Sequence, residues 1–241
     1  MTDKPAQLPP GLALAWGVTA PGRRGPKPAH SVERIVELGI ELGDTGGFEA
    51  ISLQRIAGRL GVTTNAMYRY VTSKEELIVL VAEAAWGPPP DVIQQTEGWR
   101  AGATAWVYAI VERYGERPWL LDVPIRGAPV TPNLLHWTEV LLQCLDDTGL
   151  SRHDNLGCVL LLDGYARSYS SLIRQLGATE GPPVESAAVA GFLLPRLKER
   201  GFLILESMLS GQEYEDTVDD DLDFGLNRIL DGIDHLISTS R

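Results

Sequence analysis

The chain has 241 residues, 44% of them hydrophobic, and a formal net charge of −11. This length and composition predict a globular protein with a buried core. They argue against a membrane-spanning helix, because no run approaches about 18 apolar residues, and against a diffuse, uniformly basic nucleic-acid binder.

The charge is divided unevenly along the chain. Residues 1–80 contain nine Lys or Arg against eight Asp or Glu, whereas residues 81–241 contain twelve against twenty-four. The first part has a net charge of +1 and the second a net charge of −12. This division predicts one portion that faces nucleic acid and an acidic portion that limits non-specific binding to it.

Residues 1–29 are rich in Pro and Gly and include the cations Arg23, Arg24 and Lys27. We expect them to form a flexible basic arm that packs no helix. The arm either reaches DNA or stays solvated, and the composition favours neither. Its apolar run at residues 12–16 is too short for the core of a signal peptide.

Residues 30–77 are predicted to form a three-helix, helix-turn-helix domain. One helix begins at Ser31, and Ser52 and Thr63 cap two further helices on either side of a turn at Gly61. The last of these should span about seven residues. The small Ala57 allows close contact where the helices cross, and the apolar Met67 locks the second helix onto the first, which leaves polar side chains on the outer face.

Paired capping signals predict the start of the next helix. Thr72 and Ser73 are each followed three residues later by a glutamate, Glu75 and Glu76. We expect this helix to run to the Gly-Pro-Pro-Pro sequence at residues 87–90 and to connect the helix-turn-helix to the rest of the chain.

Apolar residues recur at helical spacing through residues 78–241, with no strand pattern and no internal repeat. The chain is therefore predicted to be all-α, with a larger helical domain after the helix-turn-helix. Pro195 and Gly201 are expected to interrupt one of its helices. The predicted helices cover residues 98–116, a short segment after Pro118, and residues 133–147, 152–177, 185–209 and 221–238.

The segment from Ser52 to Lys74 contains four cations and no acid. Its outward hydroxyl, amide, phenol and guanidinium groups suit phosphates and base edges in the major groove. An ordinary solvated helical hairpin is the alternative, which the absence of acids disfavours.

Residues 62–77, Val-Thr-Thr-Asn-Ala-Met-Tyr-Arg-Tyr-Val-Thr-Ser-Lys-Glu-Glu-Leu, resemble the recognition-helix signature of the tetracycline-repressor (TetR) family of bacterial regulators. The specific match covers about residues 31–80. Val71 departs from it, because an aromatic pair is common there in the family. Residues 116–119, 149–150 and 224–233 are loosely similar to the tetracycline-repressor-like branch of the family.

The resemblance implies a homodimeric repressor that binds a palindromic operator and is released by a small-molecule effector. It implies that residues 78–241 bind the effector and form the dimer. By position in the motif, the residues expected to contact double-stranded DNA are Ser52, Arg55, Thr63, Thr64, Asn65, Tyr68, Arg69 and Lys74, with Arg23 and Arg24 of the arm as further candidates.

Aromatic residues are numerous in the acidic part, and helical domains of this kind can enclose an apolar cavity. For each aromatic side chain, a place in the core is the alternative, and for the arginine a place on the surface. The candidate effector-binding residues are Trp106, Trp119, Arg126, Trp137, Tyr165 and Tyr169.

The segments 152–177 and 221–238 are apolar on more than one face, which favours a partner beyond their own core. We expect a two-fold, four-helix interface, with a bundle inside one chain as the alternative. The candidate interface residues are Leu160, Gly164, Ser168, Leu172, Leu226, Ile229 and Ile233.

The sequence contains no complete motif for catalysis or metal binding. The acidic run at residues 219–223 lacks the glycine and final acid of a calcium loop, since Phe224 and Leu230 stand there. No phosphate loop, nucleophile elbow or zinc-binding His pair is present. We therefore expect no metal, no cofactor and no enzymatic activity. An enzyme with an accessory DNA-binding module and a DNA-organising protein are the weaker alternatives.

The two cysteines, Cys144 and Cys158, lie in apolar helical surroundings. Such residues are typical of buried thiols in a reducing compartment. We expect a cytoplasmic protein without a membrane partner.

Overall fold

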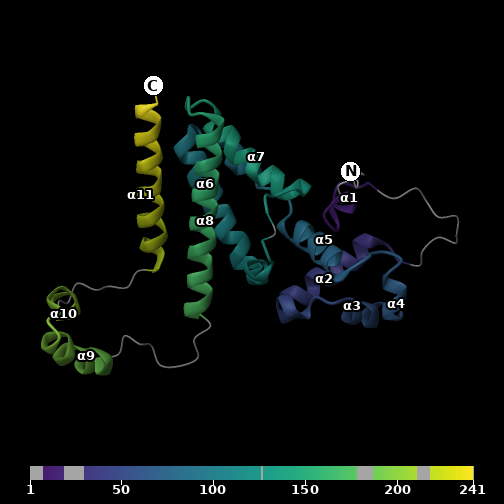
Figure 1. The fold of residues 1–241 in the computed structure, drawn as a ribbon, viewed down its shortest axis with the longest axis horizontal. Coiled ribbons are helices and arrows are strands. Elements are labelled where there is room, and N and C mark those ends of the chain that lie inside the picture. Colours follow the sequence, from purple (N-terminus) through teal and green to yellow (C-terminus); the bar gives the residue numbers. More distant parts are fainter. Residues whose placement is uncertain (1–7, 19–29, 126, 178–186, 211–217, 241) are drawn as a thin grey trace, which may run out of the picture.

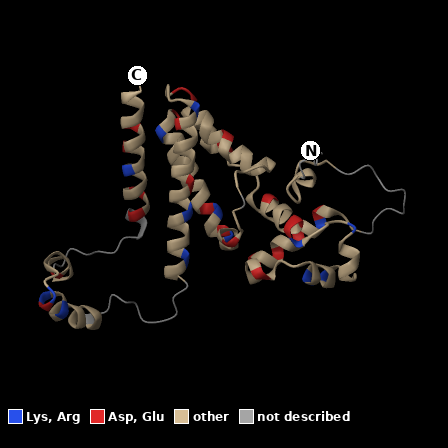
Figure 2. Cartoon of the chain, in the orientation of Figure 1, with Lys and Arg blue, Asp and Glu red and all other residues tan. Residues whose placement is uncertain are grey.

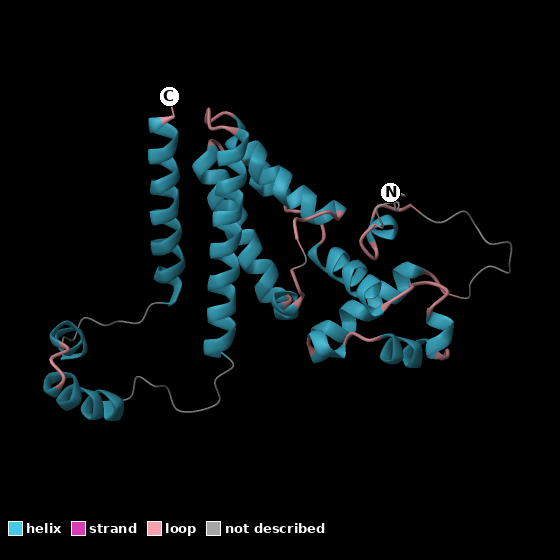
Figure 3. Ribbon diagram, in the orientation of Figure 1, coloured by secondary structure: helices cyan, strands magenta, loops and turns pink. Residues whose placement is uncertain are grey.

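The computed structural model describes residues 8–18, 30–125, 127–177, 187–210 and 218–240, and all regular structure within these ranges is helical (Figure 3). The all-α prediction is confirmed. No helix in these ranges is long and apolar enough to cross a membrane. The helices are α1 Leu12–Ala15, α2 Val32–Gly46, α3 Leu53–Leu60, α4 Thr64–Met67, α5 Lys74–Trp86, α6 Trp99–Glu116, α7 Pro132–Asp146, α8 Arg152–Gly177, α9 Ala187–Glu199, α10 Leu203–Ser210 and α11 Val218–Thr239, with 3-10 segments η1 Phe48–Ala50, η2 Asp91–Gln95 and η3 Pro118–Asp122 (Figure 1).

The helices α2 to α4 form a small unit at one end of the molecule (Figure 1). Their starts are fixed locally, because Ser31, Ser52 and Thr63 each accept a hydrogen bond from the amide three residues later, at 3.2–3.3 Å. The unit closes around Ile56 and Met67, which are fully buried. Hydroxyl caps and an apolar core together explain why this part of the fold could be predicted.

The helix α5 joins this unit to the helical bundle. It packs against α1 and α2 and also against α7, so Leu77, Val81 and Ala85 are all completely buried. Trp119 of η3 makes a second junction by lying against Gly43 of α2. A Cβ atom at residue 43 would stand only 2.7 Å from Trp119 Cε2, so this position requires glycine. The two parts of the molecule are therefore in direct contact.

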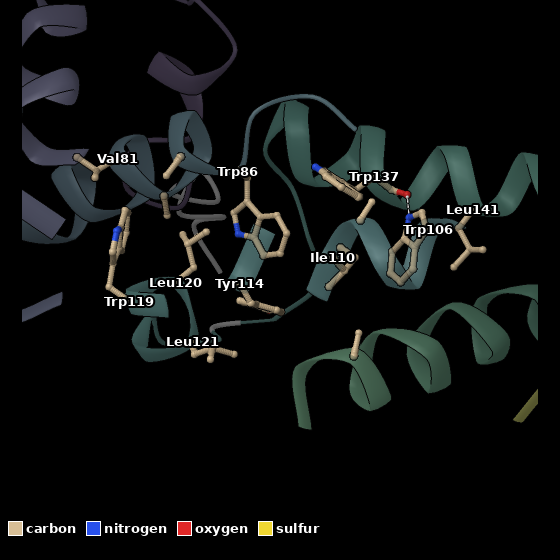
Figure 4. Close-up of a cluster of buried hydrophobic side chains, with 14 of the residues drawn as sticks. Val81, Trp86, Trp106, Ile110, Tyr114, Trp119, Leu120, Leu121, Trp137 and Leu141 are labelled. Atoms are coloured by element: carbon tan, nitrogen blue, oxygen red, sulfur yellow. Dashed lines mark hydrogen bonds between the residues drawn. The ribbon is translucent and has the colours of Figure 1, made fainter. Parts of the chain in front are cut away.

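The larger domain is a bundle in which α6 and α8 pack together, with α7 and α11 against them. Its core contains Trp86, Trp106, Tyr114 and Trp137, which meet edge to face with ring centroids 5.2–6.3 Å apart (Figure 4). The indole N–H of Trp106 donates to the carbonyl of Trp137 at 2.8 Å. Aromatic packing and a satisfied buried donor make this a solid core.

The expectation that the arm packs no helix is wrong for residues 12–15, which form α1. The sequence Leu-Ala-Leu-Ala contains neither Pro nor Gly, and Leu14 and Ala15 gain burial against the core. Gly11 allows this close approach, because a Cβ atom there would lie 3.1 Å from the side chain of Val79. The indole of Trp16 then donates to the carbonyl of Val130 at 2.9 Å.

Two other helix predictions differ from the structure. The helix α4 has four residues instead of about seven, because the amides of Tyr70 and Val71 both turn back to the carbonyl of Met67. Pro195 lies inside α9 and does not end it, whereas Gly201, with φ of 70°, separates α9 from α10. A proline removes one helical hydrogen bond, but a left-handed residue turns the chain out of the helix.

Candidate nucleic-acid interface

The turn between α3 and α4 depends on one glycine. Gly61 has φ of 67° and ψ of 26°, a left-handed conformation that favours glycine, and the amide of Val62 returns to the carbonyl of Ala57 at 3.0 Å. Ala57 is 1% exposed where the helices meet, and Met67 is fully buried. These contacts fix the angle at which α4 leaves α3.

With Met67 turned inward, the opposite side of α4 is polar. Thr63, Asn65 and Arg69 are exposed, Tyr68 is 52% exposed and Thr64 is half-buried. Because α4 ends at Met67, Tyr68 and Arg69 follow it rather than lie within it. All five predicted contacts from this segment are at least partly accessible to DNA.

The cations of this unit are of two kinds. Arg59 forms an ion pair with Glu41 of α2 at 2.9 Å, so its charge is already compensated within the protein. Arg55, Arg69 and Lys74 are exposed, and within the described residues none of them forms an ion pair. The basic positions of α3 lie at the outer edge of the unit, while α2 and α5 carry its acids (Figure 2). These three charges remain available for phosphates.

The start of α5 combines a charge with backbone donors. The hydroxyl of Ser73 accepts from the amide of Glu76 at 3.0 Å, and the buried carboxylate of Glu76 accepts from the amide and hydroxyl of Thr72. The predicted capping box thus forms around Glu76. It holds Lys74 at the first helical position, where the helix dipole favours an anion.

Two of the predicted DNA contacts, Ser52 and Thr63, also cap helices and still have a hydroxyl proton to donate. The hydroxyl oxygens of Ser52 and Thr63 accept the amides of Arg55 and Ala66. Their hydroxyl protons are not used in these bonds, so each can still donate to a phosphate oxygen. Arg23 and Arg24 lie outside the described residues.

A polar junction between α5 and α7 was missed by sequence reasoning. The carboxylate of Glu83 accepts from the amide of Asn133 at 2.6 Å, and the side-chain amide of Asn133 donates to the carbonyl of Glu83 at 2.9 Å. Thr131 does not cap α7 with its own side chain, so Glu83 supplies the cap from another helix. The only sequence signal was an acid inside the apolar stretch of residues 80–86.

The same junction holds the end of α5. Arg117 donates to the carbonyl of Ala85 at 3.0 Å, and the indole of Trp137 donates to the carbonyl of Gly87 at 3.0 Å. Cations and donors satisfy the free carbonyls at the end of a helix. Any displacement of α5 relative to α6 and α7 must break these bonds.

The described residues among the predicted effector contacts lie in different parts of the domain. Trp106 and Trp137 lie in the bundle core, whereas Trp119 faces α2 and donates to Asp44 at 2.8 Å. Tyr165 and Tyr169 are half-buried, and the hydroxyl of Tyr165 donates to Leu222 of α11 at 2.8 Å. Arg126 lies outside the described residues. Trp106, Trp119 and Trp137 are thus buried, whereas Tyr165 and Tyr169 pack only partly against the core, and their role in effector binding stays a prediction.

The predicted interface residues fall into two groups. Leu160, Gly164, Ser168 and Leu172 are exposed along one line of α8, with Leu160 as much as 73% exposed. On α11, Leu226 and Ile233 are 1% and 3% exposed and Ile229 is half-buried, so these side chains pack within the chain. Only the α8 group offers an uncovered surface.

Comparison with known proteins agrees with this arrangement. Residues 35–81 match the family model described as bacterial regulatory proteins of the tetR family, and residues 94–237 match the tetracyclin repressor-like C-terminal domain. The chain is 30% identical over 243 residues to the HTH-type transcriptional repressor DrrR1 of Streptomyces coeruleorubidus, covering 95% of this chain and 87% of the relative.

Solved structures share the fold. Apo ActR from Streptomyces coelicolor has a TM-score of 0.70 at 19% identity, covering 90% of this chain and all of that one. ActR in complex with actinorhodin has a TM-score of 0.68 at 20% identity, covering 84% of this chain and 96% of that one. Both domain models, the relative and the fold lead to one conclusion: this chain belongs to the TetR family of transcriptional regulators.

Proposed function

We propose that the protein is a homodimeric repressor that binds a palindromic operator in the cytoplasm and leaves it when a small molecule binds the helical domain. It acts by binding and not by catalysis. The observation that carries this proposal is the set of unpaired cations, Arg55, Arg69 and Lys74, beside the polar face of α4. The relative DrrR1 is named a transcriptional repressor, which supports repression rather than activation.

On DNA, the residues of this surface have different tasks. Thr64, Asn65 and Tyr68 meet base edges, because α4 carries them outward at the tip of the unit. Arg55, Arg69 and Lys74 meet phosphates, together with Ser52 and Thr63. Phosphate contacts fix the position of the protein, and base contacts select the sequence.

The dimer is formed through the exposed line of Leu160, Gly164, Ser168 and Leu172 on α8. A helix with large apolar side chains on its outer face is stabilised by a partner, and two copies related by a two-fold axis bury the same surface in each other. Two symmetric reading units then match two operator half-sites.

Release follows from the contacts of α5. ActR forms a complex with actinorhodin, and by analogy we place a small-molecule effector in the helical domain of this chain. Occupancy moves α7, and the bonds between Glu83 and Asn133 make α5 follow, which displaces Lys74 at the other end of α5. The effector acts only through its different affinity for the two arrangements.

The DNA-binding proposal is tested by operator selection followed by titrations over a range of salt concentrations. Lys74→Ala should weaken binding to every selected operator alike and lower the salt slope by about 1 per half-site, whereas Asn65→Ala should change the preferred bases. Lys198→Ala on α9 removes the same charge far from α4 and serves as the matched control. An unchanged salt slope in Lys74→Ala contradicts the phosphate role.

The dimer proposal is tested with Leu160→Glu combined with Leu172→Glu. Both side chains are exposed, so the folded protomer should keep its thermal stability while sedimentation shows half the mass. Operator affinity should fall roughly a hundredfold, because the two half-sites are no longer linked. Val92→Glu, at another exposed apolar position, is the control. A double variant that still sediments as a dimer rejects this surface.

A further inference from the structure

A cleft of about 620 Å³ lies between the last turns of α7 and α11. These two helices finish at the same end of the bundle, away from the helix-turn-helix (Figure 1). The walls of the cleft come from η2, the start of α6 and the last turns of α7 and α11. This volume lies within the range of small-molecule sites, roughly 300–1,000 Å³. Four separate elements converge on it, and none of the predicted effector residues lines it.

The accessible apolar surface of the cleft comes from Trp99. This residue, at the start of α6, is half-buried and lines the cleft. Ile93, Val140 and Ile237 lie behind the cleft and are only 0%, 1% and 6% exposed, so they support its wall from within the core. The indole ring of Trp99 can pack against the apolar body of a ligand.

The charges of the cleft are all negative. Its lining contains Asp147 and Asp234 but no Lys, Arg or His. Both carboxylates are exposed, and neither forms a hydrogen bond or ion pair with another side chain in the described part of the chain. Asp147 also follows the last turn of α7, where the carbonyl end of the helix adds negative potential. A cation is therefore favoured and an anion disfavoured.

The start of α6 adds hydrogen-bond donors. Gly98 precedes the helix and has no side chain to cap it, so amides of the first turn have no side-chain partner there. A carbonyl or hydroxyl oxygen on a ligand can accept from them. The cleft thus combines a half-buried indole ring, two carboxylates and backbone donors.

We propose that this cleft binds an amphiphilic organic cation, with its apolar body against Trp99 and its positive charge toward Asp147 and Asp234. The helix α7 runs from this cleft to the Glu83 cap on α5, so an occupant that moves α7 has a direct connection to the DNA-binding unit. This regulatory consequence rests on the proposed function, whereas binding itself does not.

The test uses two probes of nearly equal size and shape and opposite charge, tetraphenylphosphonium and tetraphenylborate, titrated by calorimetry into the full-length protein. Tetraphenylphosphonium should bind at least about tenfold more tightly than tetraphenylborate. Asp147→Asn with Asp234→Asn should weaken its binding by roughly fivefold. Glu112→Gln with Glu199→Gln makes the same change of net charge elsewhere on the surface and should leave the affinity within about twofold.

Cys144 reports the location of the ligand in the unmodified protein. It lines the cleft and is half-buried, whereas Cys158 is buried elsewhere on α8. Burial raises the pKa of the Cys144 thiol, so its alkylation by iodoacetamide is slow enough to follow by mass spectrometry. Saturating tetraphenylphosphonium should slow this alkylation several-fold.

The outcomes are distinct. Equal binding of the two probes, equal affinity in the Asp147→Asn, Asp234→Asn variant, or unprotected Cys144 each overturns the cleft assignment. Protection of Cys144 with a charge-dependent affinity supports it. Release of operator DNA is measured separately. If the probe binds the cleft but DNA is not released, the binding site is supported and its coupling to DNA through α7 is rejected.

Discussion

Polar side chains have opposite roles in the two parts of this molecule. In the helix-turn-helix, Arg55, Arg69 and Lys74 extend from the surface without an ion pair among the described residues. In the bundle, Arg174 forms a bidentate pair with Asp122 at 2.8–2.9 Å, and Arg167 donates to Tyr114 and to a backbone carbonyl. In our proposal, Arg55, Arg69 and Lys74 bind DNA, whereas Arg167 and Arg174 hold helices of the bundle together. Substitutions can separate the two roles.

The largest expected effect comes from the bundle core. Trp137→Ala removes a side chain that is 2% exposed, packs on Trp86 and Trp106, and donates to Gly87. It should lower the free energy of unfolding by about 3–5 kcal/mol, measured by urea denaturation. Trp16→Ala, which removes an exposed indole, should cost much less. Similar losses in both variants would mean that the cluster is not the centre of the core.

A crossed pair of arginine variants tests the comparison directly. Arg167→Ala leaves the hydroxyl of Tyr114 and the carbonyl of Leu121 without their donor and should cost about 1–3 kcal/mol of stability, with operator affinity of the folded protein unchanged. Arg69→Ala should do the reverse, with a loss of operator affinity and a change in stability below about 0.5 kcal/mol. Parallel urea and DNA titrations check both. Equal effects on both properties in either variant contradict the division of roles.

A smaller effect concerns a carboxyl inside the bundle. Burial raises the pKa of Asp163, and the nearby Arg167 only partly opposes this. Because the folded-state pKa lies above that of the unfolded chain, ionisation of Asp163 costs stability as the pH rises through the folded value. Asp163→Asn should therefore raise the urea midpoint slightly at neutral pH, and the gain should shrink as the pH falls toward 3.8, the ordinary value. A gain that is independent of pH assigns the effect to packing.

Local signals explain which parts of the fold could be predicted. Ser31, Ser52, Thr63 and Ser73 cap their helices through contacts within three residues, so the sequence around each is sufficient. The outward side chains of α4 followed from the same periodicity. By contrast, α1 is stabilised by its distant contact with Val79, which no local pattern encodes.

Long-range pairing explains the rest. The aromatic residues proposed for the effector looked interchangeable in sequence, and only the fold shows that Trp119 belongs to a junction with α2 and Trp106 to the core. The cleft was missed because its walls come from residues 93–99, 140–148 and 234–238, which are separated by two long intervals of chain. On α11, the apolar pattern was right but its partner was α8 of the same chain.

The cap that Glu83 provides to α7 bears on the construction of chimeric regulators. The most tempting place to exchange sensor modules is the Gly-Pro-Pro-Pro sequence at residues 87–90, directly after α5. A cut there leaves the carboxylate of Glu83 buried without Asn133 and leaves the first turn of α7 uncapped. A transplanted reading unit will therefore need residues 131–133, or a substitute donor, supplied by its new sensor.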